Sequence, residues 1–454
     1  MSLHETLKEY SKSEMYPFHM PGHKRMLDGC YKIDMTEVEG VDDLHDPDGV
    51  IADEQNRLAR LYKVDKAFML VGGSTVGNLS AIYGTLNEND LILIGRNSHK
   101  SVYNGATLRH LRVGYIYSKV DENGIYKASS LKDIEDAVER AGEMPKAILI
   151  TSPTYEGYFC EIEKISEYCH KNKIILIVDE AHGAHLGFNK WFPNQTSRYA
   201  DITITSLHKT LPCLTQTAAM LVSTDRVNIS RIREALDIFE TSSPSYILMN
   251  SISECLDILE KDGDLFREYV DNLNEFYSFS GQLRNLRVLN ESYQKKDMGK
   301  LVISTKHTSI TGIELARILR EKYKIETELS SFSYVLAMTS VMDTKDGFDR
   351  LKKALEEIDA SLQKGEIKVP VAKTINPSKK MELWQAKTEP FKEIDLSEAE
   401  GKTSTSMICL YPPGAPIVVP GEEVTNQAID VINDALEKGI HVTGLNNGRI
   451  CVVN

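Results

Sequence analysis

Six short apolar runs between residues 67 and 222 restrict the possible folds of this chain more than any other feature. Helix-like segments such as Ser129–Ala141 and Lys164–Asn172 lie between several of the runs. This alternation predicts an α/β fold, with a buried, mainly parallel sheet and helices on both of its faces. The runs are Ala67–Val71, Leu91–Ile94, Ala147–Thr151, Ile174–Val178, Ile202–Thr205 and Ala218–Val222.

A chain of 454 residues is expected to form two or three packed units. Residues 1–50, rich in Gly, Pro, His and Asp, predict an N-terminal arm of extended chain and loops, and residues 51–260 the large domain. Residues 261–370 alternate helix-like segments such as Ile313–Tyr323 with strand-like runs such as Lys300–Ser304. They predict a smaller α+β domain, and residues 371–454 a C-terminal module.

Net charge and cysteine content indicate which binding partners and which cellular compartment are expected for this chain. The formal net charge is -13 and no basic run offsets it, which argues against a nucleic-acid-binding surface. No stretch approaches the ~20 apolar residues that span a bilayer, and the polar N-terminus is not typical of a signal peptide. The seven scattered cysteines include no C-x-x-C pair, so reduced thiols in the cytoplasm are expected.

The string Ser206-Leu-His-Lys209 directly follows the Ile202–Thr205 run. In parallel sheets, ligands bind beyond the carboxyl ends of the strands. A lysine there, flanked by a hydroxyl and an imidazole, suits an aldehyde cofactor that carries a phosphate: Lys209 condenses with the aldehyde, while Ser206 and His208 donate to the phosphate. Alone, the string fits an ordinary surface lysine better.

Asp179 follows the Ile174–Val178 run and is expected at a second strand end. A carboxylate there can keep a pyridine nitrogen protonated, which makes the ring an electron sink, although Asp is also favoured as a helix cap. Asp179 and Lys209 lie at the ends of two successive strands, and the segment between them is long enough for one crossover connection. We therefore expect both to face one crevice, and the pair is far more specific than either residue alone.

Two further strand ends carry candidate cofactor contacts. Gly72-Gly-Ser-Thr-Val-Gly-Asn78 opens a helix, where Ser74 and Thr75 offer donors to a phosphate. The segment is neither a Walker loop nor a dinucleotide fingerprint, and a plain strand–turn–helix connection explains it equally well. His99 follows the Leu91–Ile94 run and could stack on a flat cofactor, or be structural.

Segments from the arm to the C-terminal module carry a family resemblance. They are Phe18–Lys24, Gly40–Gly49, Gly72–Thr75, Asn97–Lys100, Ser152–Gly157, Asp179–His182, Ser206–Pro212, Ser242–Tyr246 and Tyr411–Glu422. On these segments the chain resembles the Orn/Lys/Arg decarboxylase family of fold-type-I pyridoxal-phosphate (PLP) enzymes, in the short form without an N-terminal wing domain. Two departures from the family pattern are Arg25, where glycine is usual, and Cys213, where a small apolar residue is usual.

The resemblance implies a role for each candidate residue. Lys209 would be the Schiff-base lysine, Asp179 the partner of the pyridine nitrogen and His99 the ring-stacking group. Ser243, or a close neighbour, would reach the phosphate of the adjacent subunit in a homodimer or higher oligomer with shared active sites, and His182 would act beside the cofactor. No metal is implied. The phosphate would be held by Ser74, Thr75, Ser206 and His208.

The function that follows is decarboxylation of a basic L-amino acid to its amine and carbon dioxide, a step towards polyamines. Arginine, lysine and ornithine all fit, with arginine slightly favoured. Lys209 or His208 is the candidate proton donor. An aminotransferase or another lyase of the same fold, and a catalytically silent regulatory homologue, remain alternatives. The carboxylates considered for the substrate's distal cation are Asp42, Asp43, Asp46, Asp48 and Glu328.

Overall fold

The computed structural model describes residues 1–261, 263–367, 377–411 and 414–454. Contacts within the chain divide it into two compact units. Unit 1 comprises Met1–Leu86, Ser166–Glu268 and Ser340–Met342. Unit 2 comprises Asn87–Ile165, Tyr269–Thr339 and Asp343–Asn454. Two of the boundaries between these segments fall within helices, namely α6 (Ile162–Lys171) and α10 (Gly263–Ser280).

Unit 1 contains four of the strands expected from the apolar runs. They lie in the order β1-β7-β6-β5. The β5–β6 pair is parallel, whereas β7 runs antiparallel to both β6 and β1. Nearly every residue of these strands is buried, which explains their continuous apolar sequence. The strands are β1 (Lys66–Leu70), β5 (Ile175–Asp179), β6 (Ile202–Thr205) and β7 (Ala218–Val222).

Helix α3 (Gly73–Thr85) lies on all four of these strands and on α8. Glycine permits this close approach: a Cβ on Gly77 would come within 2.6 Å of Ile204, and one on Gly84 within 2.7 Å of Ile232. The first turn of α3 is thereby held at the sheet. The other helices of unit 1 are α2 (Val50–Tyr62), α7 (Leu207–Thr210), α8 (Ile229–Phe239), α9 (Tyr246–Lys261) and a short 3-10 helix at Thr196–Arg198.

The expectation of extended chain and loops over residues 1–50 is wrong at its beginning, where helix α1 spans Leu3–Tyr10. Ser2 and Glu5 form a capping box at its N-terminus. Leu3 and Leu7 lie four residues apart on one face and are fully buried, and the helix packs on α9. The rest of the arm consists of loops and a short 3-10 helix at Gly29–Lys32.

Unit 2 contains three parallel strands in the order β4-β2-β3. Strands β2 (Leu91–Gly95) and β4 (Ala147–Thr151) match the predicted runs. Strand β3 (Arg112–Ile116) was not predicted, because Arg112 and Gly114 interrupt its apolar sequence. Helices α4 (Lys100–Leu108) and α5 (Leu131–Ala141) belong to the same part of the chain.

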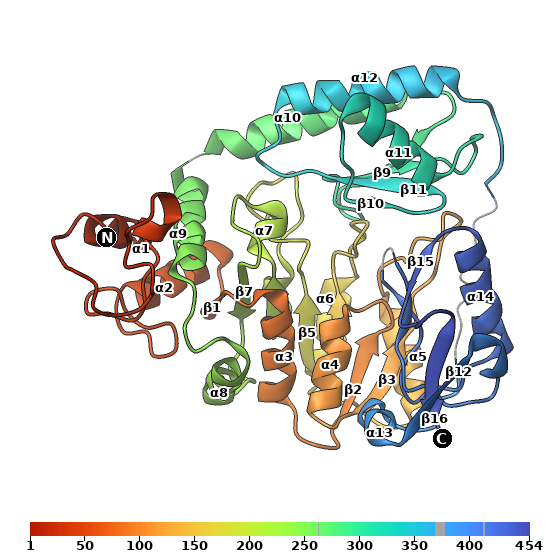
Figure 1. Cartoon of the computed structure of the whole chain (residues 1–454), viewed down its shortest axis with the longest axis horizontal. Helices are drawn as coiled ribbons and strands as arrows, with labels where there is room; N and C mark the ends of the chain where they lie inside the picture. Colours follow the sequence, from red (N-terminus) through yellow and green to blue (C-terminus); the bar gives the residue numbers. More distant parts are fainter. Residues whose placement is uncertain (262, 368–376, 412–413) are drawn as a thin grey trace. The chain divides into compact units, whose positions relative to one another are not determined.

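A second, antiparallel sheet of unit 2 has the order β10-β11-β9-β8. Helix α11 packs on β10 and β11 and against α12 (Figure 1). The predicted run Lys300–Ser304 is confirmed with the same bounds, as β9. The elements are β8 (Arg287–Val288), β9, β10 (Leu329–Ser330), β11 (Tyr334–Met338), α11 (Gly312–Tyr323) and α12 (Lys345–Ser361).

The C-terminal part of unit 2 has its own apolar core around Val418, Ile432 and Val452. Two small sheets, β12-β16 and β14-β13-β15, surround it with helix α14. The elements are α13 (Leu383–Thr388), β12 (Phe391–Asp395), a 3-10 helix at Leu396–Glu398, β13 (Ile408–Tyr411), β14 (Pro416–Val418), α14 (Asn426–Glu437), β15 (His441–Thr443) and β16 (Arg449–Val453).

The predicted α/β class is confirmed, since helices alternate with strands that pair mainly in parallel within the apolar runs. The predicted domain boundaries stay a prediction, and the one at 370/371 lies outside the described residues. In the described part of the chain, no helix is both long and apolar enough to cross a bilayer.

Candidate active site

Lys209 lies in α7, the four-residue helix that directly follows β6. Its Nζ is 3.1 Å from Nε2 of His182, which is only 5% exposed. An ammonium group only donates hydrogen bonds, so Nε2 accepts here and the neutral ring carries its proton on Nδ1. The structure thus brings together two of the predicted catalytic residues, from the loop after β5 and the helix after β6.

Asp179 is the last residue of β5 and is 2% exposed. Asn78 Nδ2 donates to its Oδ2 at 2.9 Å, and the N–H of Ala181 donates to Oδ1 at 3.1 Å. The carboxylate does not cap a helix, because a turn follows it. These donors fix its orientation. Asn78 was not singled out from the sequence, although it is a polar residue on an apolar helix one turn after Ser74.

Two hydroxyl groups meet at the start of α3. The Oγ atoms of Ser74 and Ser206 are 2.7 Å apart, and Ser206 is buried. Gly73, with φ of +73°, forms the turn that places Ser74 in the first helical turn, where backbone N–H groups have no partner within the helix. Freely rotating hydroxyls beside a helix N-terminus form a suitable cup for a phosphate.

One ring nitrogen of His208 is hydrogen-bonded to the backbone. Its Nδ1 is 2.8 Å from the carbonyl oxygen of Thr217 and donates to it, since a carbonyl only accepts. Burial, together with the charge of Lys209, lowers the pKa of His208. The neutral ring therefore presents the lone pair of Nε2, and must gain a proton before Nε2 can donate to a phosphate.

His99 belongs to unit 2, where it precedes the first residue of α4. Its Nδ1 accepts from the N–H of Ser101 and lies 2.8 Å from the Ser101 hydroxyl. This accepting role assigns the proton of the neutral ring to Nε2. The imidazole is exposed, and its N-cap bond sets the direction of its plane.

The other predicted cofactor contacts are Thr75, in the first turn of α3, and Ser243, in the loop between α8 and α9. Both are exposed. Within unit 1 the structure pairs Ser74 with Ser206 and His182 with Lys209, but it does not bring Ser243 into either pair. An exposed loop position is what a contact to a second subunit requires.

Asp42, one of the carboxylates considered for binding the substrate's distal cation, accepts hydrogen bonds from the backbone. It accepts from the N–H groups of Asp48, Gly49, Ile51 and Ala52 at the start of α2. Burial raises the pKa of Asp42, but these donors outweigh burial and lower it overall. The residue therefore caps a helix and shapes the loop before it.

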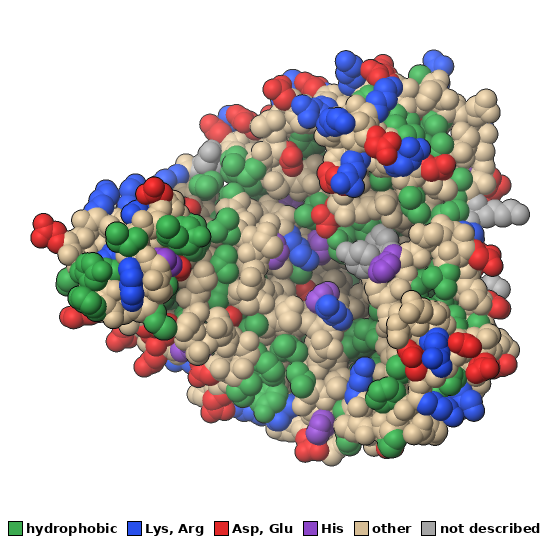
Figure 2. Space-filling view, in the orientation of Figure 1, with side chains coloured by type: hydrophobic (Ala, Val, Ile, Leu, Met, Phe, Trp, Pro, Cys, Tyr) green, Lys and Arg blue, Asp and Glu red, His purple; other side chains and the backbone are tan. Residues whose placement is uncertain are grey.

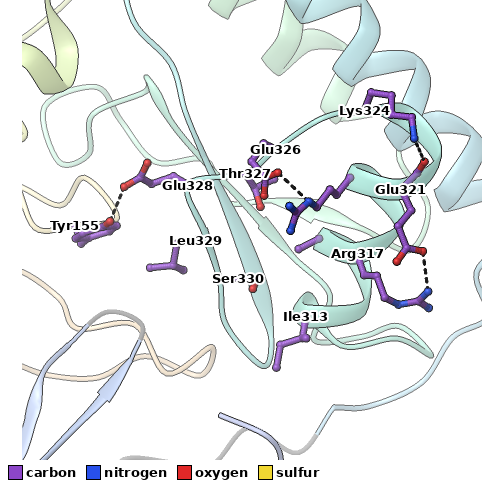
Figure 3. Close-up of a pocket in the computed structure, with 12 residues that line it drawn as sticks. Tyr155, Ile313, Arg317, Glu321, Lys324, Glu326, Thr327, Glu328, Leu329 and Ser330 are labelled. Atoms are coloured by element: carbon purple, nitrogen blue, oxygen red, sulfur yellow. Dashed lines mark hydrogen bonds and ion pairs between the residues drawn. The ribbon is translucent and has the colours of Figure 1, made fainter. Parts of the chain in front are cut away.

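Glu328, the carboxylate considered outside the arm, lines a cavity of about 920 Å³ in unit 2 (Figure 3). Two other carboxylates of this cavity have cationic partners within it: Arg317 pairs with Glu321, and Arg320 with Glu326, both at 3.1 Å. Glu328 instead accepts a 2.6 Å hydrogen bond from the neutral Tyr155 hydroxyl. In Figure 3 these two side chains point toward each other, away from the ion pairs.

The residues of unit 1 fit the chemical groups of PLP. A lysine amine suits the aldehyde, a buried carboxylate held by two donors suits the pyridine nitrogen, and the hydroxyl pair at α3 suits the phosphate. No group of three or more metal-ligating side chains occurs in the parts of the chain that the structure describes.

Comparison with family models gives two matches. The model of the Orn/Lys/Arg decarboxylase major domain matches residues 2–296, and that of the Orn/Lys/Arg decarboxylase C-terminal domain matches residues 361–444. An arginine decarboxylase of Bacillus subtilis is 29% identical, over 98% of this chain and 96% of its own length. The lysine decarboxylase LdcA of Pseudomonas aeruginosa is 24% identical, over 62% of this chain and 42% of its own length.

Solved structures with the same fold include two lysine decarboxylases. The constitutive enzyme of E. coli has a TM-score of 0.85 at 18% identity, covering 100% of this chain and 82% of its own. LdcF of Francisella novicida has a TM-score of 0.84 at 17% identity, covering 100% and 81%. An alanine–glyoxylate aminotransferase from Nostoc is less similar, with a TM-score of 0.55 over 70% of this chain.

Proposed function

The chain belongs to the Orn/Lys/Arg decarboxylase family, and we propose that it decarboxylates a basic L-amino acid with PLP as cofactor. The pairing of Lys209 with His182 is the observation that carries the proposal, since it joins an amine to an imidazole at adjacent strand ends. Arginine is the favoured substrate, because relatives that match nearly the whole chain are named arginine decarboxylase.

Each side chain has a distinct task in this proposal. PLP, when bound, supplies the electron sink for the bond that breaks between Cα and the carboxylate. Asp179, oriented by Asn78, keeps the pyridine nitrogen protonated, and Ser74, Thr75 and Ser206 hold the phosphate. His99 stacks on the ring, a neighbour's Ser243 adds a phosphate contact, and His208 adds another once its Nε2 is protonated.

Lys209 is our candidate for the group that returns a proton to the substrate Cα. When it is not joined to the cofactor, the Lys209 amine would be the group that carries the proton. The bond to His182 Nε2 directs this amine. His208 is less suited to the task, because its Nδ1 proton is committed to Thr217 and its pKa is lowered by burial and by Lys209.

For the cationic end of the substrate we propose Glu328. Its described partner is a phenol, so its negative charge is not neutralised by the cations of the cavity. A guanidinium can form two parallel hydrogen bonds with a carboxylate, which an ammonium cannot. Glu328→Gln should raise KM for L-arginine more than it changes kcat, whereas Glu326→Gln should leave KM nearly unchanged.

We further propose a cytoplasmic homodimer that supplies amines for polyamine formation. Large apolar side chains on the arm support the assembly: Phe18 is 92% exposed, and Met15, Tyr16, Met20 and Met26 are exposed near it. Figure 2 shows hydrophobic side chains gathered over the N-terminal region of unit 1. Exposed apolar patches of this kind are typical of surfaces that a partner covers.

The deciding experiment uses L-arginine, L-lysine and L-ornithine labelled at the carboxyl carbon. The PLP-loaded protein should release labelled carbon dioxide without any keto-acid acceptor, and fastest from arginine. Label in a keto acid, formed only when 2-oxoglutarate or pyruvate is supplied, would identify an aminotransferase and overturn the proposal. No product from any substrate would identify a catalytically silent homologue.

Two variants separate cofactor binding from turnover. Lys209→Ala should abolish the visible absorption of the bound cofactor, while the exposed Lys190→Ala should preserve it. Asp179→Asn should retain PLP but lose most of its turnover, because the amide cannot keep the pyridine nitrogen protonated. Near-normal turnover by Asp179→Asn would reduce this carboxylate to a structural role.

A further inference from the structure

A buried ion pair joins the end of β2 to the C-terminal part of unit 2. Arg96 and Glu422 are 326 residues apart in sequence, and they are 4% and 0% exposed. Arg96 Nη1 donates to Glu422 Oε1 at 2.7 Å, and Nη2 donates to Oε2 at 2.8 Å. This two-point arrangement fixes the guanidinium in a plane as well as in place.

The remaining polar groups of the pair are also satisfied. Arg96 Nε donates to the carbonyl of Pro416 and Nη2 to that of Ile417, while Glu422 Oε2 also accepts from the N–H of Val419. The guanidinium lies 4.7 Å from the centre of the Tyr115 ring. The side chain of Arg96 is therefore held almost entirely by residues 416–422.

The backbone of Arg96 is held just as firmly. Its N–H donates to the carbonyl of Ile116 at 2.9 Å, and its own carbonyl accepts from the Tyr103 hydroxyl at 2.7 Å. A turn closed by Ser98 N–H and the Gly95 carbonyl follows, and His99 comes next. Only Asn97 and Ser98 thus lie between Arg96 and His99, and they belong to a tight turn.

We propose that Arg96 and Glu422 are positioning residues that hold the turn carrying His99, and with it the ring that the Ser101 bond orients. This rests on the proposed function, in which His99 stacks on the cofactor. Glu422 acts on the ring through the guanidinium and the turn, without touching substrate or cofactor. A carboxylate near the end of the chain thereby controls a residue at the end of β2.

The test follows the circular dichroism of bound PLP in its visible band, a readout that needs no substrate. At full cofactor occupancy, Glu422→Gln should change this band in the same sense as His99→Ala. The control is Glu423→Gln, whose carboxylate pairs with Lys380 nearer the surface, and it should leave the band as in the wild type.

Turnover supplies the second readout through a double-mutant cycle. Glu422→Gln should lower kcat about tenfold with KM little changed, because it misdirects a group that acts at the ring. In the His99→Ala background, the same substitution should lower kcat by less than about twofold. Losses that multiply would show that Glu422 acts independently of His99 and would overturn the proposal.

A folding defect in Glu422→Gln is avoided by the double variant Arg96→Gln/Glu422→Gln, which leaves no buried charge unpaired. The double variant should also show the altered band. An unaltered band in this variant at full cofactor occupancy would overturn the proposal. An unaltered band in His99→Ala would overturn it as well. If the band responds as expected but no carbon dioxide is released, only the proposed reaction is wrong.

Discussion

At the scale of single residues, Glu180 shows how burial changes an acid beside the candidate site. Burial raises the pKa of this carboxyl to about 8, although Thr196 donates to Oε1 and partly opposes the shift. Within the described residues, Oε2 has no hydrogen-bond partner. Near neutral pH the group is mostly protonated, so Asp179 has a neutral neighbour.

Glu180 should therefore make the protein less stable as pH rises. Because the folded pKa lies above the unfolded value, the folded state keeps a proton that the unfolded state releases, and stability falls between about pH 4 and pH 8. The free energy of unfolding of Glu180→Gln, relative to that of wild type, should be higher at pH 9 than at pH 5 by on the order of 1–3 kcal/mol. Urea unfolding at both pH values measures this, and a pH-independent difference would contradict it.

Arg25 occupies backbone space that favours glycine, with φ of 55°. Its side chain offsets this strain: the guanidinium donates to the carbonyls of Tyr10 and Met15 and lies over the Tyr10 ring. Arg25→Gly loses the contacts but relieves the strain, whereas Arg25→Ala loses the contacts alone. We expect the alanine variant to be about 1 kcal/mol less stable than the glycine variant, as thermal unfolding of the two can measure.

The sequence was most informative where chemistry and position coincide. Lys209 and Asp179 could be predicted because each follows an apolar run that ends at the ligand-binding edge of a sheet. Asn78 and Thr217 could not, because their roles depend on α3 bringing Asn78 to Asp179 and on the loop before β7 bringing Thr217 to His208. Such partners follow from packing, which no local pattern records.

At the scale of elements, the loop before α2 shows that an acidic segment can have a structural task. Asp42 satisfies N–H groups of the first helical turn, which have no partner inside the helix. Sequence patterns predicted α5, α6 and α11, but they missed α1, α10 and β3. The Ser2–Glu5 capping box could have indicated the start of α1. In β3, an arginine and a glycine interrupt the apolar run by which a strand is recognised.

Asp42→Ala should cost about 1–2 kcal/mol of stability at pH 7, since it removes the cap of α2. Because backbone donors lower the pKa of Asp42 despite the opposing effect of burial, its contribution is present above the unfolded pKa and is lost as pH falls through the folded pKa. Asp46→Asn, at an exposed position, is the control. Equal stability of both variants would contradict the assignment.

At the scale of the whole molecule, the exposed Phe18 of the N-terminal arm is expected to contribute to the proposed homodimer. Phe18→Ser combined with Met20→Ser should raise the dimer dissociation constant at least about tenfold, because each side chain contributes roughly 1–3 kcal/mol when buried. The exposed Phe391→Ser, on β12, is the control. Sedimentation over a range of concentrations measures the constant, and PLP should strengthen the wild-type dimer by mass action.

The bond between Arg96 and Glu422 also concerns how the protein is made. A ribosome that adds about 5–20 residues per second takes roughly 16–65 s to pass from the first of these residues to the second. During that interval the emerging chain holds a guanidinium whose native counter-charge has not yet been synthesised. The end of β2 can reach its final form only after residue 422 has been synthesised, and a product truncated before that residue would remain a substrate for chaperones and proteases.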